Sequence, residues 1–534
     1  MVFGIAAVCS ATVRYVSTAG NDANNGASWG GAKKTLQAAI NVSGVNDEIW
    51  VAQGTYTASA GVQVGYVNGS THNGLQIYGG FAGNETSRDQ RNPDPSATVL
   101  HGNRTDNSNG MPVLEFYNIG HIVIDGFTIE NGLGRLFGGV PPYSYPSRLG
   151  GGIFMPGCWA ITINNNIIRN NKATYAYLAT YPFCSFGGGV CASYSGTNTE
   201  RSYFTNNRVE QNTSNGGGGG VSWGVSNTEM SNNSFLANDA SYTGSGISKA
   251  WAGGGGLYAG GTDVNIDCNT FQSNTASAGG ESSAFGGALY RPALRTSIYR
   301  NEFIENSVSG TGTSGRGGAI YIVCGIVANN VFLRNSSSHE GGAIYFVSNA
   351  GTYTAMITSD TFQDNYSAIN AGRSVSVCFD STCTLKNNIF YYSQDDTSYR
   401  WEVYGAASPS GYSYNGARIT VDHNCFYHPN TPPSLGQYCY ASAPYPDYRN
   451  AIITDNGGEV FADPLLTGYR LSANSPCLSV GDPSEMLSLH NLGLLPISDC
   501  DYFGNFRFYE THDESGYHYQ IDIGAHQYNS QDVP

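Results

Sequence analysis

The chain has 534 residues, 25 of them basic and 40 acidic, which gives a formal net charge of −15. Only 12% of the residues are charged, against about 25% in ordinary globular domains, and this acidic balance argues against a nucleic-acid partner. No apolar run approaches the ~18–20 residues of a membrane-spanning helix. Glycine and proline make up about 17% of the chain, below the ~25–30% typical of disordered chains, so we expect a folded protein without a transmembrane segment.

Residues 1–11 are predicted to be the remnant of a secretory signal. The apolar stretch 2–8 precedes Cys9, Ser10 and Ala11, an order typical of the end of a signal peptide. The alternative is an ordinary first strand. The signal interpretation predicts an extracellular or cell-surface protein.

Among the twelve cysteines, two pairs lie close enough in the sequence to close small loops. The pairs are Cys184/Cys191 and Cys378/Cys383, and such pairs become disulfides in an oxidising compartment. In a chain of this size, however, a cysteine is often only a small buried apolar residue, so both interpretations stay open.

Residues 12–60 are predicted to form an N-terminal cap and the first coils of a repeat structure. Within them, residues 33–42 place Leu36, Ala39 and Ile40 at helical spacing. Such a short amphipathic helix suits the end of a stack of repeats, where the core would otherwise be exposed.

The segment 61–460 contains two recurring motifs. The first is two glycines, then glycine or alanine, then an aliphatic residue, and the aliphatic residue recurs about every 32 residues. It is found at Ile153, Val190, Val221, Leu257, Leu289, Ile320 and Ile344.

The second motif is an asparagine, a large apolar residue two positions later, and another asparagine three positions after that. It is centred on Ile167, Val209, Phe235, Phe271, Phe303, Phe332 and Phe362, with Asp360 in place of the first asparagine in the last copy. Phe390 and Phe426 continue the series without the second asparagine.

These periods predict an all-β, right-handed parallel β-helix with three strands in each coil. Units of this length bury their apolar faces by stacking, and the segments between the motifs are short alternating runs rich in β-branched and aromatic residues. Stacked coils lie about 4.8 Å apart, so asparagines can bond to their equivalents in neighbouring coils. Asparagine and glycine also tolerate the left-handed conformation of a sharp corner.

The alternation of Gly-Gly-Ala-Ile with Phe-x-x-Asn resembles the repeats of chlamydial polymorphic outer membrane proteins and of related right-handed β-helix proteins of the pectin-lyase-like superfamily. The entry segments 15–26 and 51–56, and the end segments 461–464 and 522–525, are similar to those of secreted bacterial β-helices. This resemblance implies the fold and a bacterial secreted or outer-membrane-associated protein. The last part of the chain does not resemble a membrane barrel, so the likeness is to the passenger part of the chlamydial proteins.

Insertions collect mainly at one corner of the predicted coil, between the phenylalanine and the next glycine pair. We expect them to project from one edge of the rod, where repeat proteins often bind ligands. Their aromatic rings are suited to stack on sugars or to anchor a protein partner, and covering the coil edges is an equally good alternative. The candidate ligand-binding residues are Tyr143, Tyr145, Tyr175, Tyr177, Tyr181, Tyr242 and Trp251.

The segment 461–534 lacks both motifs and is predicted to close the C-terminal end. Asp499 and Asp501 precede Gly504, an arrangement that offers oxygen ligands to Ca²⁺; a hydrogen-bonded turn is the alternative. No other cofactor is indicated.

Sequence motifs for catalysis are sparse. Asp395, Asp396 and Glu402 form a dense acidic stretch, as paired carboxylates of a glycosidase would require. Of the five lysines, Lys33 and Lys34 lie in the predicted cap, and Lys172, Lys249 and Lys386 have no evident cluster of aspartates around them in the sequence, which argues against a lyase base beside bound calcium.

Two functions therefore stay open. The favoured one is a secreted or cell-surface β-helix without catalysis, acting as an adhesin, a structural rod or a glycan-binding surface, with an extracellular glycan or a host or cell-surface protein as partner. The alternative is an extracellular polysaccharide lyase or glycosidase.

Overall fold

The computed structural model describes most of the chain. The described residues are 11–59, 62–104, 110–137, 147–174, 185–194, 196, 200–242, 251–280, 282–290, 296–311, 315–348, 354–369, 371–393, 401–407, 415–429, 434–441, 451–467, 470–478, 480–482, 509–513, 516–520 and 523–524. The candidates Tyr143, Tyr145, Tyr175, Tyr177, Tyr181, Asp395, Asp396, Asp499 and Asp501 lie outside them.

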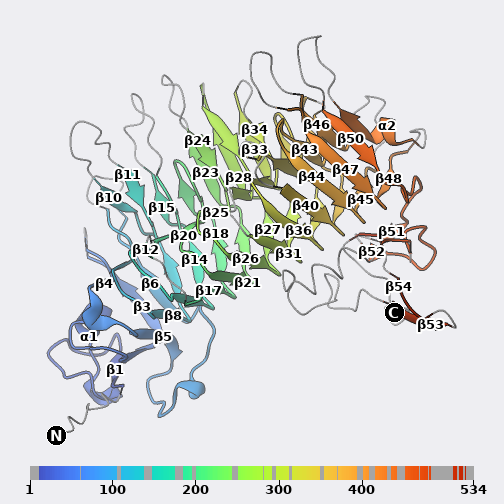
Figure 1. The fold of residues 1–534 in the computed structure, drawn as a ribbon. Coiled ribbons are helices and arrows are strands. Elements are labelled where there is room, and N and C mark those ends of the chain that lie inside the picture. The colour runs from blue at the N-terminus through green and yellow to red at the C-terminus, as the bar shows by residue number, and fades with distance from the viewer. Residues whose placement is uncertain are drawn as a thin grey trace, which may run out of the picture.

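Three long parallel sheets run the length of a rod and confirm the predicted β-helix (Figure 1). Sheet 1 consists, in spatial order, of β1 (Val13–Val16), β2 (Glu48–Ala52), β5 (Gln76–Phe81), β8 (Val123–Asp125), β13 (Thr162–Asn164), β17 (Ser202–Thr205), β21 (Thr228–Ser231), β26 (Val264–Asp267), β31 (Ser297–Tyr299), β36 (Gly325–Ala328), β40 (Thr354–Thr358), β44 (Thr382–Lys386), β47 (Arg418–Asp422) and β50 (Ile452–Asp455).

Sheet 2 carries the glycine motif and runs beside sheet 1. It consists of β4 (Gly65–Asn68), β7 (Leu114–Tyr117), β12 (Ile153–Pro156), β16 (Val190–Ser193), β20 (Val221–Gly224), β25 (Leu257–Ala259), β30 (Leu289–Tyr290), β35 (Ile320–Ile322), β39 (Ile344–Phe346), β43 (Val375–Val377), β46 (Val403–Gly405) and β49 (Cys439–Ala441).

Sheet 3 carries the phenylalanine motif and closes the coil. It consists of β3 (Gly54–Thr57), β6 (Thr98–His101), β9 (Thr128–Glu130), β14 (Ile167–Arg169), β18 (Arg208–Glu210), β22 (Ser234–Leu236), β27 (Thr270–Gln272), β32 (Glu302–Ile304), β37 (Val331–Leu333), β41 (Thr361–Gln363), β45 (Ile389–Tyr391) and β48 (Cys425–Tyr427).

Two shorter sheets extend the coils at the corner where insertions were predicted, between sheets 3 and 2. Sheet 4 consists of β15 (Lys172–Ala173), β19 (Thr213–Ser214), β23 (Asp239–Tyr242), β28 (Thr275–Ala278), β33 (Ser307–Gly310), β38 (Ser336–Ser337) and β42 (Tyr366–Ser367). Sheet 5 consists of β24 (Trp251–Gly253), β29 (Ser283–Phe285) and β34 (Gly315–Arg316).

The remaining elements are short. Three antiparallel pairs are β10 (Arg135–Phe137) with β11 (Ser147–Leu149), β51 (Leu466–Thr467) with β52 (Arg470–Leu471), and β53 (Tyr509–Asp513) with β54 (Gly516–Gln520). The helices are α1 (Leu36–Ile40), α2 (Leu435–Tyr438) and the 3₁₀ turns Trp29–Gly31, Ser70–His72 and Arg88–Gln90. None of the described helices is long and apolar enough to cross a membrane.

The predicted cap helix is confirmed as α1. Thr35 accepts a hydrogen bond from the Ala38 backbone and caps the helix, while Leu36, Ala39 and Ile40 are buried. A Cβ added to Gly65 at the start of sheet 2 would lie 3.2 Å from both Leu36 and Ile40. The helix therefore covers the apolar interior at the first strand of sheet 2, as the spacing predicted.

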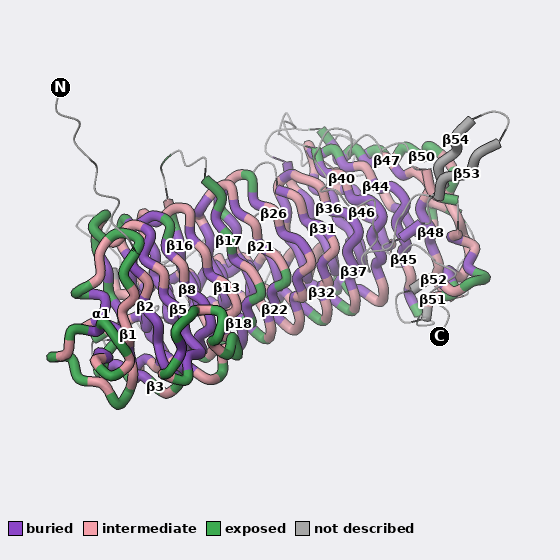
Figure 2. Tube along the Cα trace, turned by 90° about the horizontal axis from the view of Figure 1, so that it is seen from below, coloured by how far each residue is buried: buried purple, intermediate pink, exposed green. Residues whose placement is uncertain are grey.

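Phenylalanine rings form a column inside the rod. Phe235, Phe271, Phe303, Phe332, Phe362, Phe390 and Phe426 occupy equivalent places in successive coils, with neighbouring ring centroids 4.6–4.9 Å apart and ring planes within 3–6°. All are fully buried. Figure 2 shows buried residues following the strands along the rod and exposed residues gathering at corners and ends.

The asparagine ladders are confirmed, with one correction of register. Along the ladders an asparagine side-chain amide donates to the side-chain oxygen of the next rung, as from Asn269 to Asn301 at 3.0 Å, and among the described rungs Asp360 supplies a carboxylate in place of an asparagine. The first rung is Asn166, Ile168 and Asn171, one residue later than expected, because residues 165–171 read Asn-Asn-Ile-Ile-Arg-Asn-Asn and fit either register.

Glycine turns its corner as expected, but at the asparagine corner the residue that turns is not the one expected. The left-handed conformation falls on the residue before each ladder asparagine, and that residue varies: Cys268, Arg300 and Glu305 have φ values of 53°, 52° and 55°. The ladder asparagines need their side chains inside the coil, so the preceding residue makes the turn. At the glycine corner the first glycine makes it, as at Gly254 with φ 65°.

The second glycine of the motif is required by close approach between coils. A Cβ on Gly255 would lie 2.3 Å from the Thr275 carbonyl oxygen and 2.4 Å from that of Gly287. At the third position, a Cβ on Gly256 would be 3.1 Å from its nearest neighbour. This difference explains why alanine replaces glycine only at the third position of the motif.

The predicted loop closure by Cys378 and Cys383 is not found. Both are buried free thiols. Cys383 lies in β44 with its side chain in the main core, whereas Cys378 hydrogen-bonds the Tyr345 side chain on the outside of sheet 2. Cys191 is also a buried free thiol, and Cys184 lies outside the described residues.

Candidate functional site

A column of tyrosines runs along the outer face of sheet 2. Tyr258, Tyr290, Tyr321 and Tyr345 are direct neighbours in the parallel register of β25, β30, β35 and β39. Each follows the core-facing aliphatic residue of the glycine motif, and strand alternation therefore turns it outward. The first three rings are partly exposed, and Tyr345 is buried.

Sheet 5 adds further rings beside these tyrosines. The Trp251 ring lies 5.1 Å from Tyr290, and the Phe285 ring lies 4.8 Å from Tyr321. We call the set Trp251, Tyr258, Phe285, Tyr290, Tyr321 and Tyr345 the aromatic column. It occupies the angle between sheets 2 and 5, over four successive coils.

The outer tyrosines are not stacked on one another as the inner rings are, although Phe285 stacks on Tyr290 at 5.3 Å and 17°. Between successive tyrosines the centroid distances are 5.7, 5.2 and 5.3 Å, and the ring planes are inclined by 46°, 67° and 31°. Because these tyrosines are tilted, one tyrosine does not cover the whole ring face of the next, as happens in the phenylalanine column.

The charges at one end of the aromatic column compensate each other. The Arg316 guanidinium lies 5.1 Å from the centre of the Tyr345 ring and donates to the Glu340 carboxylate at 2.8 Å. Burial raises the pKa of Tyr345 well above its ordinary value, so its phenol stays neutral. The described part of this surface is thus aromatic and carries a paired charge.

Of the sequence-predicted ligand residues within the described ranges, one lies in the aromatic column and one does not. Trp251 is partly exposed there. The expected surface position of Tyr242 is incorrect, because only 2% of it is exposed. It lies among alanines of sheets 4 and 5, which pack face to face into a small core of their own.

The sequence analysis missed the four tyrosines. A signal was present, since tyrosine follows the motif aliphatic residue in four successive copies, from Leu257-Tyr258 to Ile344-Tyr345. Strand alternation makes such a position outward-facing, so the recurrence alone would have predicted an external column.

Glu402 lies in a buried polar cluster. Its Oε1 lies 2.6 Å from His428 Nε2, and its Oε2 accepts from the Ser374 hydroxyl. Nearby, the Arg373 guanidinium lies 3.7 Å from the centre of the Tyr392 ring. Glu402 is 2% exposed, because it precedes Val403 of sheet 2 and so takes the place that the third residue of the glycine motif has in earlier coils. A carboxylate bound in this way faces the coil, not a substrate.

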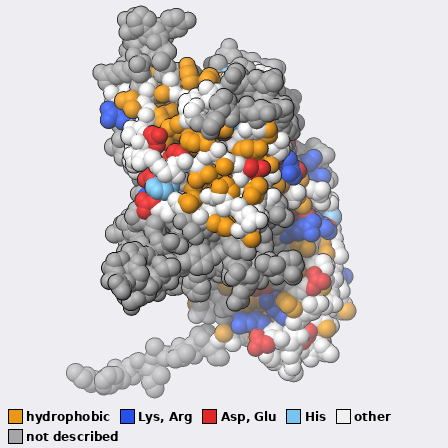
Figure 3. Space-filling view, turned by 90° about the vertical axis from the view of Figure 1, so that its right-hand side faces the viewer, with side chains coloured by type: hydrophobic (Ala, Val, Ile, Leu, Met, Phe, Trp, Pro, Cys, Tyr) orange, Lys and Arg blue, Asp and Glu red, His pale blue; other side chains and the backbone are white. Residues whose placement is uncertain are grey.

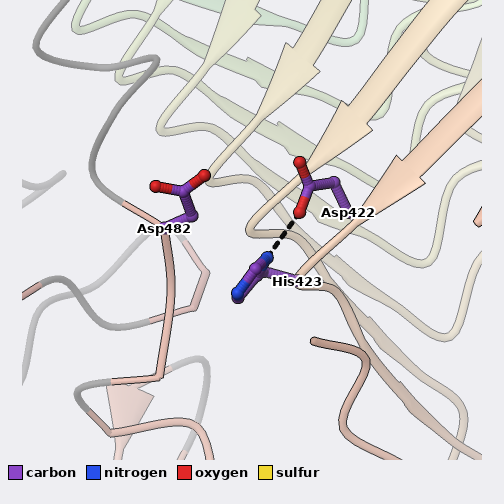
Figure 4. A group of neighbouring side chains, drawn as sticks. All are labelled: Asp422, His423 and Asp482. Carbon is purple, nitrogen blue, oxygen red and sulfur yellow. Dashed lines mark hydrogen bonds and ion pairs between the residues drawn. The ribbon is translucent and has the colours of Figure 1, made fainter. Parts of the chain in front are cut away.

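A second cluster unites residues that are distant in the sequence (Figure 4). Asp422, His423 and Asp482 have ligand atoms within 4.8 Å of one another, and His423 Nδ1 contacts an Asp422 oxygen. Lys386 Nζ lies 3.4 Å from Asp422 and 2.6 Å from Asp482. Lys386 has no cluster of aspartates around it in the sequence, as expected, but the fold brings Asp422 and Asp482 to it, the second from 96 residues away.

The chemistry of this second cluster favours a structural role. Oxygen and imidazole ligands suit a divalent cation, but the buried Lys386 ammonium already supplies the positive charge between the two carboxylates. A lysine held by two carboxylates is stabilised as the ammonium form and is a poor base. The ion pairs instead join β44 and β47 to the C-terminal segment.

Comparisons with known proteins give weak matches. A family model described as "Protein of unknown function (DUF1565)" matches residues 18–235, less than half of the chain. No curated protein sequence matches.

Solved structures with similar folds include pectate lyase Pel9A, with 13% identity, 97% of both chains covered and a TM-score of 0.39. A complex of XylC with xylose has 11% identity, covers 96% of this chain and 98% of the other, and has a TM-score of 0.43. A rhamnogalacturonan lyase has 10% identity, 86% and 91% coverage, and a TM-score of 0.36. These scores are low, so the fold assignment rests on the strand pairing itself.

Proposed function

We propose that this protein is a secreted or cell-surface rod without catalysis that binds an extended polysaccharide along the aromatic column. The observation that carries the proposal is the register of four tyrosines in successive coils, flanked by Trp251 and Phe285. Aromatic faces pack against the apolar faces of sugars. A binding surface that repeats with every coil suits a ligand that itself repeats.

The charge of the molecule favours a neutral polysaccharide. The net charge of −15 repels polyanions, such as uronate polymers, at low salt. In the described part of the aromatic column the Arg316 charge is paired with Glu340, which leaves little to attract a carboxylated sugar.

The lyase or glycosidase alternative has less support. Two of the described clusters that contain acid–base groups, around Glu402 and Lys386, consist of side chains bound to one another, and Glu402 and Lys386 are themselves buried. The partly exposed groups of the Lys386 cluster, Asp482 and His423, are themselves bound, to Lys386 and to Asp422.

The test is binding to a panel of neutral and uronate-rich polysaccharides, measured by affinity electrophoresis and calorimetry, while ultraviolet absorbance and reducing ends are followed. We expect binding to neutral polymers and no product formation. Removing one ring contact worth about 0.5–1.5 kcal/mol should weaken binding about two- to tenfold in Trp251→Ala and Tyr290→Ala.

Tyr203→Ala is the matched control. Tyr203 is 43% exposed on the outer face of β17, in sheet 1, so its removal should leave binding unchanged. Failure of every polysaccharide to bind, or equal binding by Tyr290→Ala and the unaltered protein, would refute the proposal. Accumulation of unsaturated products or reducing ends would favour the enzyme instead, and binding of a surface protein alone would favour an adhesin.

A further inference from the structure

The described part of the C-terminal segment packs along the side of the last coils. Asn387, in the corner after β44, exchanges two hydrogen bonds with Asp482: its Nδ2 donates to the Asp482 carbonyl at 2.8 Å, and its Oδ1 accepts from the Asp482 backbone at 2.9 Å. The Gly524 backbone donates to the Asn387 carbonyl. Two distant parts of the segment therefore meet the same corner of the rod.

A small apolar cluster lies under this segment. It contains Ile389 and Cys425 from sheet 3 and Leu471, Cys477 and Ile523 from the C-terminal segment. In sheet 3 the phenylalanines next to Ile389 and Cys425 point into the rod, so Ile389 and Cys425 point outward, toward the segment.

The two cysteines of this cluster meet side chain to side chain. Both are fully buried, and their thiols are hydrogen-bonded to each other. Cys425 also donates to the Ala462 carbonyl, with a sulfur–oxygen distance of 3.4 Å, and the Ile523 backbone donates to the Cys477 carbonyl. Hydrogen bonds on both sides thus hold the two cysteines in this cluster.

We propose that Cys425 and Cys477 form a disulfide when the protein folds in an oxidising compartment, and that this bond fastens the C-terminal segment to the last coils. Each thiol loses one proton, and the pair loses two electrons as the sulfur–sulfur bond forms. The electrons pass to a disulfide oxidant, such as glutathione disulfide or the active-site disulfide of an oxidoreductase, which is reduced to two thiols.

The chemistry places this oxidation during folding. The hydrogen bond with Cys477 and burial both raise the pKa of the Cys425 thiol, and thiolates, not thiols, react with disulfides. Once the segment has docked, the reduced pair is protected from oxidants, and the oxidised pair is equally protected from reductants.

The bond would protect a vulnerable end of the rod. Figure 3 looks at the end that carries the last strands and shows hydrophobic side chains gathered at its centre, with acidic groups around them. The last phenylalanine rung, Phe426, is covered there by Tyr438 and Phe461, at 5.5 and 6.2 Å between ring centroids. Residues 425–477 include this cover, so a cross-link between these positions closes the covering stretch into a loop.

The experiment is peptide mapping by mass spectrometry of the full chain, refolded with a mixture of reduced and oxidised glutathione and alkylated without reduction. We expect one cross-linked peptide pair that contains Cys425 and Cys477 and is lighter by two hydrogens than the reduced pair. Dithiothreitol should release it only when a denaturant is also present. Recovery of both cysteines as alkylated thiols from the refolded protein would overturn the proposal.

Stability supplies a second measurement. Cys477→Ser should lower the melting temperature of the oxidised protein by about 2–4 °C, and most of this difference should vanish when both proteins are melted with reductant. The control Cys158→Ser removes a buried thiol that bonds the Phe116 carbonyl, so its effect should be the same with and without reductant. An equal response of the two variants to reductant would also overturn the proposal.

Discussion

The amide ladder contains one carboxylate, and replacing it tests how the ladder stabilises the rod. Asp360 occupies a rung between Asn330 and Asn388 and is fully buried. The side-chain amide of an asparagine rung donates twice, once to the preceding coil and once to the following one. Asn301 Nδ2 lies 2.9 Å from the Ile266 carbonyl oxygen and 3.0 Å from Asn330 Oδ1. An ionised Asp360 can accept from Asn330 but cannot make either donation.

Asp360→Asn should therefore stabilise the protein. By the strand register, the new amide would donate to the Val327 carbonyl and to Asn388 Oδ1. Two buried hydrogen bonds at roughly 0.5–1.5 kcal/mol each give a gain of about 1–3 kcal/mol. The size and shape of the side chain hardly change, so packing should contribute little.

Hydrogen exchange is the suitable assay, because long repeat arrays often do not unfold in two states. Amides of β40, β41, β44 and β45 should exchange about 5-fold to 150-fold more slowly in Asp360→Asn. The control Asn330→Asp places a second carboxylate beside Asp360 and should cost more than about 3 kcal/mol. Unchanged or faster exchange in Asp360→Asn would refute the account of the ladder.

Three further predictions concern the core, the glycine corner and pH. Phe303→Ala should cost about 3–5 kcal/mol, whereas Tyr203→Ala should change the urea midpoint little; equal losses would contradict the division into inside and outside. Gly255→Ala should reduce expression of folded protein sharply and Gly256→Ala only slightly, since their added Cβ atoms would lie 2.3 and 3.1 Å from the nearest atoms; similar yields would count against close packing. Burial, with help from neighbouring aspartates, raises the pKa of Glu459 from 4.5 to about 8. The folded state then holds a proton that the unfolded state has released, so this group's contribution to stability falls as pH rises from about 4.5 to about 8. Urea midpoints at pH 5 and pH 8 should differ less in Glu459→Gln than in the unaltered protein, and an equal difference would exclude this titration.

The repeat could be predicted from the sequence because its physical causes recur. Gly255 has a carbonyl oxygen of the next coil in the place where a Cβ would be, and Phe303 has a ring above and below it. Each coil requires the same close approach at the glycine and the same ring contact at the phenylalanine, so these residue types recur once per coil. Even the one-residue error at Ile168 arose where two registers satisfied the pattern equally.

The environment of single side chains was less predictable. Tyr242 was expected at the surface because it lies in an insertion, but the insertions pair with those of neighbouring coils and form sheets 4 and 5, with a core between them. Lys386 meets Asp482 through a fold-back of the C-terminal segment. Neither contact recurs from coil to coil, so no residue spacing in the sequence predicts it.

The contrast between the two aromatic columns is the strongest argument that the outer one serves binding. Both columns are built on the same coil spacing, yet the inner rings lie within 6° of parallel, while the outer tyrosines are inclined by 31° to 67°. Tilted and offset-parallel rings are both favourable arrangements for aromatic pairs, so the difference that bears on binding is exposure: the phenylalanines are fully buried, whereas Tyr258, Tyr290 and Tyr321 are partly exposed. The partly exposed tyrosines give up burial that the inner rings have. A flat, repeating ligand that packs against their faces would restore it.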